Sequence, residues 1–143
     1  MNFNPNVWGP HYWFFLHTIA ESYPLHPNSV TKKKYYDLIQ NFPLFIPIEE
    51  MGNTFSELID KYPVSPYLDE RESFVRWVHF IHNKINILID KKRIRLTEAL
   101  DKYRKLYIPD TIYLADKFHI KKHIIIFTFI VLLLLFIYFS YKD

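Results

Sequence analysis

Short polar side chains recur at helical spacing between residues 77 and 91, and their types make them the best candidates for chemistry. They are His79, His82, Asn83, Asn86 and Asp90. Residues three and four apart share one face of an α-helix, so this series forms a stripe of imidazole and amide groups. Such groups can donate and accept hydrogen bonds to a flat polar ligand. The alternative is an ordinary solvated helix face, which spacing alone favours.

A second pair, Trp13 and His17, is four residues apart and therefore also shares a helix face. If the two faces met, they would combine an aromatic surface for stacking with polar groups for orientation. His79 and His82 are one helical turn apart, as in some metal sites. The chain has neither a cysteine nor a well-spaced carboxylate pair to complete such a site, so the sequence predicts no metal.

Composition narrows the classes of protein to consider. The chain has 143 residues, no cysteine and a net charge of +3. The length suits one small domain with an appendage, and the missing cysteines exclude disulfides, thiolate metal sites and cysteine nucleophiles. The charge is too small to indicate a nucleic-acid partner. Only two glycines occur and half of the residues are hydrophobic, which favours a packed all-α fold.

Apolar residues at helical spacing predict the elements that would position the polar stripe. We expect helices over 10–23, 29–42, 49–62, from about 69 to beyond 88, and over 97–107. The pair Asn28-Ser29 offers a cap for the second helix, and Pro10 is expected in the first turn of the first. The fold class is therefore all-α, a four-helix bundle with a short fifth helix, over residues 1–108.

The end of the chain predicts a membrane anchor. From Ile124 to Tyr141 no charged residue occurs, and a helix of this length reaches about 27 Å, close to the hydrocarbon thickness of a bilayer. We therefore expect a connector over 109–122 and a transmembrane helix over 123–141. Lys121 and Lys122 precede the span and Lys142 follows it, which predicts an N-terminal domain in the cytosol, held at its C-terminus by a viral or internal cellular membrane.

Two aromatic and histidine motifs stand at the two ends of the predicted bundle: residues 8–18 read Trp-Gly-Pro-His-Tyr-Trp-Phe-Phe-Leu-His-Thr, and Trp77 is followed five residues later by His-Asn-x-x-Asn. These motifs resemble those of the Erv/ALR family of FAD-linked sulfhydryl oxidases. The resemblance covers roughly residues 8–91 and implies FAD as cofactor. It implies these cofactor-binding residues: Gly9, Trp13, His17, Tyr23, Trp77, His82, Asn83, Asn86 and Lys91. Lys91 matches a lysine near the cofactor phosphates, although Asp90 replaces the usual glycine before it.

The departures from the family fall in one segment. Family members read Cys-x-x-Cys-Arg-x-His-Phe, whereas residues 48–55 read Ile-Glu-Glu-Met-Gly-Asn-Thr-Phe. Thiol oxidation needs a thiolate that exchanges with substrate and a second sulfur that passes electrons to the flavin. The sequence therefore predicts no catalytic residue. It predicts a catalytically inactive, membrane-anchored relative that retains FAD and acts in binding or assembly.

Two alternatives stay open. One is an FAD-dependent oxidase component that works with cysteines supplied in trans, and the other is a cofactor-free structural membrane protein. The family's bundles commonly pair, so the resemblance implies a homodimer or a heterodimer with an active relative as the partner. Membrane-tethered relatives with short cores occur in large DNA viruses, and the Ile, Lys, Asn and Tyr bias fits an AT-rich genome, which suggests a viral source.

Overall fold

A computed structural model describes residue 1 and residues 3–142, with the side chains of all of these except residues 110–120, 136, 139 and 142. Its elements are α1 (Pro5–Glu21), α2 (Ser29–Asn41), η1 (Phe42–Phe45), α3 (Glu49–Lys61), η2 (Ser65–Tyr67), α4 (Arg71–Leu88), α5 (Leu96–Lys105) and α6 (Asp110–Lys142), where η marks a 3₁₀ helix. The described residues form helices and no strand, which confirms the predicted all-α class. The chain divides into two compact units, Met1–Tyr103 and Arg104–Asp143.

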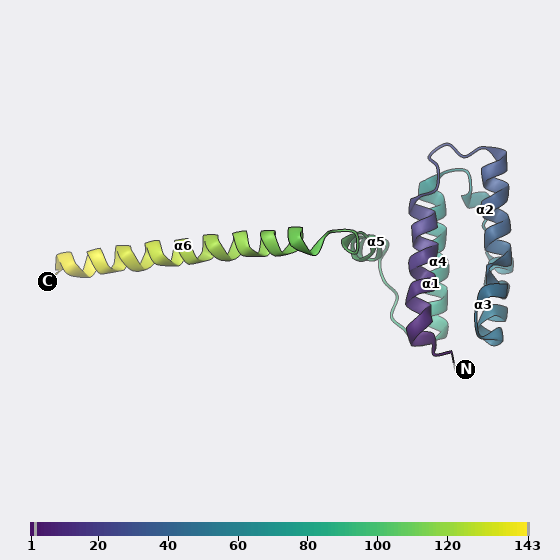
Figure 1. Ribbon diagram of the computed structural model, residues 1–143, viewed down its shortest axis with the longest axis horizontal. Helices are drawn as coiled ribbons and strands as arrows, with labels where there is room; N and C mark the ends of the chain where they lie inside the picture. The colour runs from purple at the N-terminus through teal and green to yellow at the C-terminus, as the bar shows by residue number, and fades with distance from the viewer. Residues whose placement is uncertain (2, 143) are drawn as a thin grey trace. The chain divides into compact units, whose positions relative to one another are not determined.

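Two layers make up the first unit. α1 packs along α4, while α2, η1 and α3 follow one another and form the other layer, as Figure 1 shows. α3 also contacts α4, and η1 contacts both α2 and α3. Because α1 and α4 lie side by side, residues near position 13 and residues near position 82 are brought together although they are far apart in the sequence.

Local signals explain where these helices begin. Of the predicted pair Asn28-Ser29, Asn28 caps α2, because its side-chain oxygen accepts a hydrogen bond of 2.8 Å from the Thr31 N–H. α1 begins at Pro5, whereas the sequence predicted a start near Pro10. The reason is a better start signal further upstream: the Asn4 side chain caps the Asn6 N–H at 2.9 Å, and Pro5 takes the first helical position, where its missing N–H is not needed.

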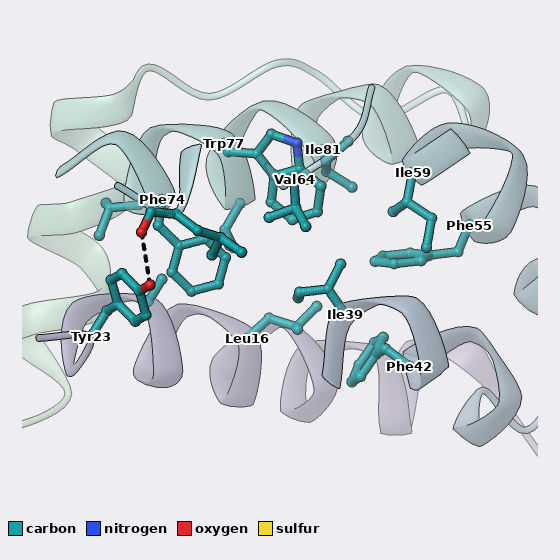
Figure 2. Packing of buried hydrophobic residues seen from close by; sticks show 14 residues of the cluster. Leu16, Tyr23, Ile39, Phe42, Phe55, Ile59, Val64, Phe74, Trp77 and Ile81 are labelled. Atoms are coloured by element: carbon teal, nitrogen blue, oxygen red, sulfur yellow. Dashed lines mark hydrogen bonds between the residues drawn. The ribbon is translucent and has the colours of Figure 1, made fainter. Parts of the chain in front are cut away.

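The core of the first unit is aromatic and aliphatic. Phe74 and Trp77 of α4 and Tyr23, which follows α1, are at most 2% exposed and pack with Ile39 of α2 and Ile59 of α3, as Figure 2 shows. Tyr23 donates its hydroxyl proton to the Leu68 carbonyl over 2.8 Å. Arg71 donates from Nε to the Tyr23 carbonyl. These bonds tie the loop after α1 to the start of α4 and so fix how α1 and α4 pair.

The predicted membrane anchor is contradicted. Among the described residues, no helix is both long enough and apolar enough to cross a membrane. The predicted localisation, a C-terminal anchor at 123–141 with a cytosolic N-terminal domain, is therefore wrong.

Candidate functional site

A cluster of stacked and hydrogen-bonded rings lies where α1 meets α4. The Trp13 indole stacks on the His82 imidazole with ring centroids 3.9 Å apart and an angle of 7° between the rings. His17 Nε2 lies 3.0 Å from His82 Nδ1, so one of these nitrogens donates a hydrogen bond and the other accepts it. α1 carries Trp13 and His17 one turn apart, and α4 carries His82 opposite both. The two polar faces predicted from spacing therefore do meet at these residues.

Burial keeps the two histidines neutral. It lowers the pKa of His17 to about 4, and the neighbouring His79 acts in the same direction. Burial also lowers the pKa of His82 to about 3, with smaller contributions in the same direction from His17, His79, Lys91 and Lys102. A buried imidazolium is poorly solvated, and a charge on one ring would repel a charge on the other. Both imidazoles are therefore uncharged at pH 7. They can therefore act as neutral donors or acceptors toward a ligand.

Asn83 ties this part of α4 to the segment that follows the helix. Its Oδ1 accepts the Ile94 N–H at 3.0 Å, and its Nδ2 donates to the Ile94 carbonyl at 2.9 Å. Nδ2 also lies 3.0 Å from His79 Nε2. Both ends of the Asn83 amide therefore form hydrogen bonds within the protein, and these bonds hold the Ile94 backbone near His79.

The helix end after Asn86 explains one departure from the family pattern. Asn86 is 6% exposed, and its carbonyl accepts a hydrogen bond of 2.7 Å from the Lys91 N–H. Asp90, between them, has φ of 56°. Glycine suits this left-handed conformation best, and aspartate is one of the few other residues that tolerate it. Asp90 therefore preserves the turn that a glycine would make, and Lys91 emerges from it exposed to solvent.

Three further residues of the predicted site lie elsewhere. Tyr23 and Trp77 are in the core, and the Trp77 Nε1–H donates to the Tyr62 carbonyl at 2.9 Å. Gly9 lies on α1, where an added Cβ would meet nothing within 4 Å. The structure therefore brings Trp13, His17 and His82 into contact, ties Asn83 to His79 and Ile94, and gives Tyr23 and Trp77 packing roles.

Two residues that the family resemblance does not assign to the cofactor join the cluster. His79 contributes through Asn83, as described above. Tyr103 of α5 donates its hydroxyl proton to Thr18 Oγ1 at 2.9 Å, and its ring centroid lies 6.2 Å from that of His17. The spacing of Leu96, Leu100 and Tyr103 on α5 follows a helical stripe and could have indicated that this helix packs on α1.

The segment that departs from the family begins α3. Ile48 occupies the N-cap position without a side-chain cap, and Glu49 and Glu50 stand in the first turn. Thr54 donates its hydroxyl proton back to the Glu50 carbonyl at 2.9 Å. Among the described residues, no group of three or more histidine, cysteine, aspartate or glutamate side chains is placed to hold a metal ion.

The sequence of this chain is similar to a known protein family and to several of its members. The family model described as Erv1/Alr matches residues 10–104. A probable FAD-linked sulfhydryl oxidase of Acanthamoeba polyphaga mimivirus is 30% identical over 107 residues, which cover 74% of this chain and 75% of that protein. The mitochondrial FAD-linked sulfhydryl oxidase erv1 of Schizosaccharomyces pombe is 30% identical over 79 residues, 55% of this chain and 43% of that protein.

Solved structures show the same fold. The crystal structure of the yeast Erv1 core superimposes with a TM-score of 0.63 at 25% identity, covering 68% of this chain and 80% of that one. The FAD-binding domain of Erv1 from Saccharomyces cerevisiae superimposes with a TM-score of 0.66 at 23% identity, covering 73% of this chain and 97% of that one.

Proposed function

This chain belongs to the Erv1/Alr family, and from that premise we propose that it is an FAD-binding member that does not oxidise thiols and acts in binding or assembly. The observation that carries the proposal is the first turn of α3, where Ile48, Glu49, Glu50 and Met51 stand in a chain without any cysteine. In the family pattern these four positions hold Cys-x-x-Cys.

The side chains at these positions cannot relay electrons from a dithiol. Ile48 has no heteroatom, and Met51 carries a thioether that neither ionises nor forms a reversible disulfide. Disulfide exchange needs a thiolate, and the carboxylates of Glu49 and Glu50 do not perform it. FAD, when bound, would supply a two-electron acceptor, but this chain has no residue to deliver a substrate's electrons to it.

The binding surface, in contrast, keeps features that fit a flavin nucleotide. Trp13 and His82 provide flat rings, and both histidines of the cluster are neutral. Trp8 Nε1 and His79 Nδ1 are buried and have no hydrogen-bond partner among the described residues. Because buried N–H groups are nearly always paired in native proteins, these two fit a ligand that carries acceptor atoms. Trp13 and His82 would hold a ring of the cofactor, with Lys91 available to its phosphates.

Flavin absorbance tests the cofactor part of the proposal. The purified full-length chain should take up FAD on refolding or titration and show visible flavin absorbance that survives gel filtration. Trp13→Ala should lose most of that absorbance, because it removes the ring that stacks on His82, while Phe80→Ala, on a partly exposed face of α4, should keep it. A colourless wild-type protein that gains no flavin would refute the cofactor claim.

Oxygen consumption tests the catalytic part. With FAD and a dithiol, the chain should consume oxygen no faster than free FAD at the same concentration. Uptake above that background by the protein alone would contradict the proposal. Uptake that appears only when a cysteine-bearing relative is added would instead support an oxidase component with thiols supplied in trans.

Assembly is the role that suits a domain of this family without its redox cysteines. An apolar surface formed by Phe15 of α1 and by Leu44 and Phe45 of η1 supports it, because these side chains are 46%, 79% and 64% exposed. These elements are in contact, since Phe15 stacks on Phe42 of η1 and Tyr12 donates a hydrogen bond to the Phe45 carbonyl. Apolar patches of this kind mark interfaces. Leu44→Glu should therefore weaken association with a second family bundle in sedimentation experiments.

A further inference from the structure

Asn83 has an amide orientation that its surroundings determine. The Ile94 N–H needs an acceptor, so the side-chain oxygen must face it, at 3.0 Å. The Ile94 carbonyl needs a donor, so the side-chain nitrogen must face it, at 2.9 Å. Exchanging the two atoms would place two donors against each other and two acceptors against each other. The amide of Asn83 can therefore stand only one way round.

This orientation decides which nitrogen of His79 carries the proton. The second N–H of Asn83 Nδ2 points to His79 Nε2 at 3.0 Å. Because Nδ2 is a donor only, Nε2 must accept, and in a neutral imidazole the proton then resides on Nδ1. Burial lowers the pKa of His79, an effect that the Ile94 carbonyl partly opposes, so the ring is neutral at pH 7.

The proton on Nδ1 has no acceptor among the residues that the structure describes. His79 Nδ1 is buried, and no hydrogen bond to it is formed by any of these residues. A buried donor without a partner is costly, and such groups in native proteins usually meet a ligand, an ion or an ordered water. The His79 ring lies near the His17–His82 pair, because a proton on His79 would lower the pKa of both histidines.

We propose that His79 is a ligand-contacting residue of this chain whose Nδ1–H donates a hydrogen bond to an acceptor atom on a heteroaromatic ring of the bound cofactor, and that Asn83 is the positioning residue that fixes its tautomer. This inference rests on the proposed FAD binding. The ligand chemistry is a ring nitrogen or ring carbonyl; the flavin of FAD offers both, and its adenine offers ring nitrogens.

Two isosteric substitutions separate the two nitrogens of His79. The amide of asparagine occupies the place of Nδ1, and the amide of glutamine occupies the place of Nε2. His79→Asn therefore keeps a donor toward the ligand and loses the contact with Asn83. His79→Gln keeps a partner for Asn83 and loses the donor toward the ligand. His26→Gln, at an exposed loop position, is the control for a histidine change elsewhere.

The measurement is FAD affinity by quenching of flavin fluorescence, with each full-length variant first compared with the wild type by circular dichroism and thermal melting. We expect binding by His79→Gln to be about tenfold weaker, about 1.4 kcal/mol, and binding by His79→Asn and His26→Gln to stay within about threefold of the wild type. FMN, titrated in the same way, and AMP, added as a competitor of FAD, identify the ring, since each carries only one of the two.

Outcomes separate this inference from the proposed function. If the wild type binds FAD and both His79 variants match it, or both weaken equally, His79 does not donate to the ligand and the inference is overturned while FAD binding stands. If the wild type binds no flavin nucleotide, the proposed function fails and this inference fails with it.

Nitrogen NMR of the imidazole tests the tautomer independently of binding. The ¹⁵N shifts of His79 in the ligand-free chain should show a protonated Nδ1 and an unprotonated Nε2. Asn83→Asp replaces the donor facing Nε2 by a carboxylate oxygen, so the ¹⁵N shift of Nε2 in this variant should become that of a protonated nitrogen. A wild-type His79 protonated on Nε2 would overturn the role given to Asn83.

Discussion

The paired histidines predict that this domain loses stability in mild acid. A histidine whose pKa is lowered by folding binds its proton more readily in the unfolded chain. The free energy of unfolding is therefore at its full value above pH 6.5, the ordinary pKa, and falls as the pH decreases toward the folded pKa. For this chain the folded values are about 4 for His17 and about 3 for His82. The loss should occupy the window from pH 6.5 downward.

The magnitude follows from those values. At pH 5 each ring lies about 1.5 pH units below its unfolded pKa while still unprotonated in the folded state, which costs about 2 kcal/mol per ring. The pair should then cost about 4 kcal/mol, and the lowered pKa of His79 acts in the same direction. Small domains have about 5–15 kcal/mol of stability in total, so the effect is a large fraction of it.

Urea unfolding at several pH values between 5 and 7 measures this effect, in a range where carboxylates contribute little. We expect a slope of about two protons per molecule near pH 5, or about 2.7 kcal/mol per pH unit. The double variant His17→Leu/His82→Leu should lose most of that slope, and His11→Gln, at an exposed site, should keep it. A wild-type slope below about one proton would refute the buried neutral pair.

Three further predictions concern packing and ligand linkage. Gly52→Ala should destabilise the domain by about 1–3 kcal/mol in urea unfolding, because its Cβ would lie 2.8 Å from the Pro43 carbonyl oxygen. Gly9→Ala is the matched control, with nothing within 4 Å of its Cβ, and should be neutral or stabilising by up to about 1 kcal/mol. Tyr23→Phe should cost about 1–2 kcal/mol, since it leaves the buried Leu68 carbonyl without its 2.8 Å partner; a cost below about 0.3 kcal/mol would contradict this. FAD at about a hundred times its dissociation constant should stabilise the chain by about 2.7 kcal/mol in thermal unfolding, and an unchanged melting temperature would contradict binding.

Most of the fold can be predicted from the sequence because its signals are local. Apolar spacing and capping residues act over one or two turns, which is enough to predict α2 with its cap at Asn28 or Ser29. The start of α1 differs from the prediction because Pro10 is a weaker start signal than Asn4 followed by Pro5. The predicted membrane span rests on the run without charged residues at 124–141, whereas no helix among the described residues is both long enough and apolar enough to cross a membrane.

The candidate site can be predicted only in part, because its contacts link residues far apart in the sequence. Trp13, His17 and His82 share faces at helical spacing, which indicates that they could meet. Spacing cannot show that Asn83 turns toward Ile94 and away from a ligand. Nor can it separate Trp77, which belongs to the polar-stripe helix but points into the core, from a residue that stacks on a ligand.

The segment without the family's cysteines keeps its packing. Phe55, the residue of the motif that this chain retains, is 3% exposed and lies with its ring 5.4 Å from Phe42 and 6.2 Å from Trp13. Gly52, where the family has arginine, leaves no room for a side chain against Pro43. The paired substitutions Ile48→Cys and Met51→Cys would therefore not restore the whole motif, because an arginine at position 52 would require η1 to move away from α3. The absence of cysteine at positions 48 and 51 and the close packing of α3 on η1 belong to the same short stretch of sequence.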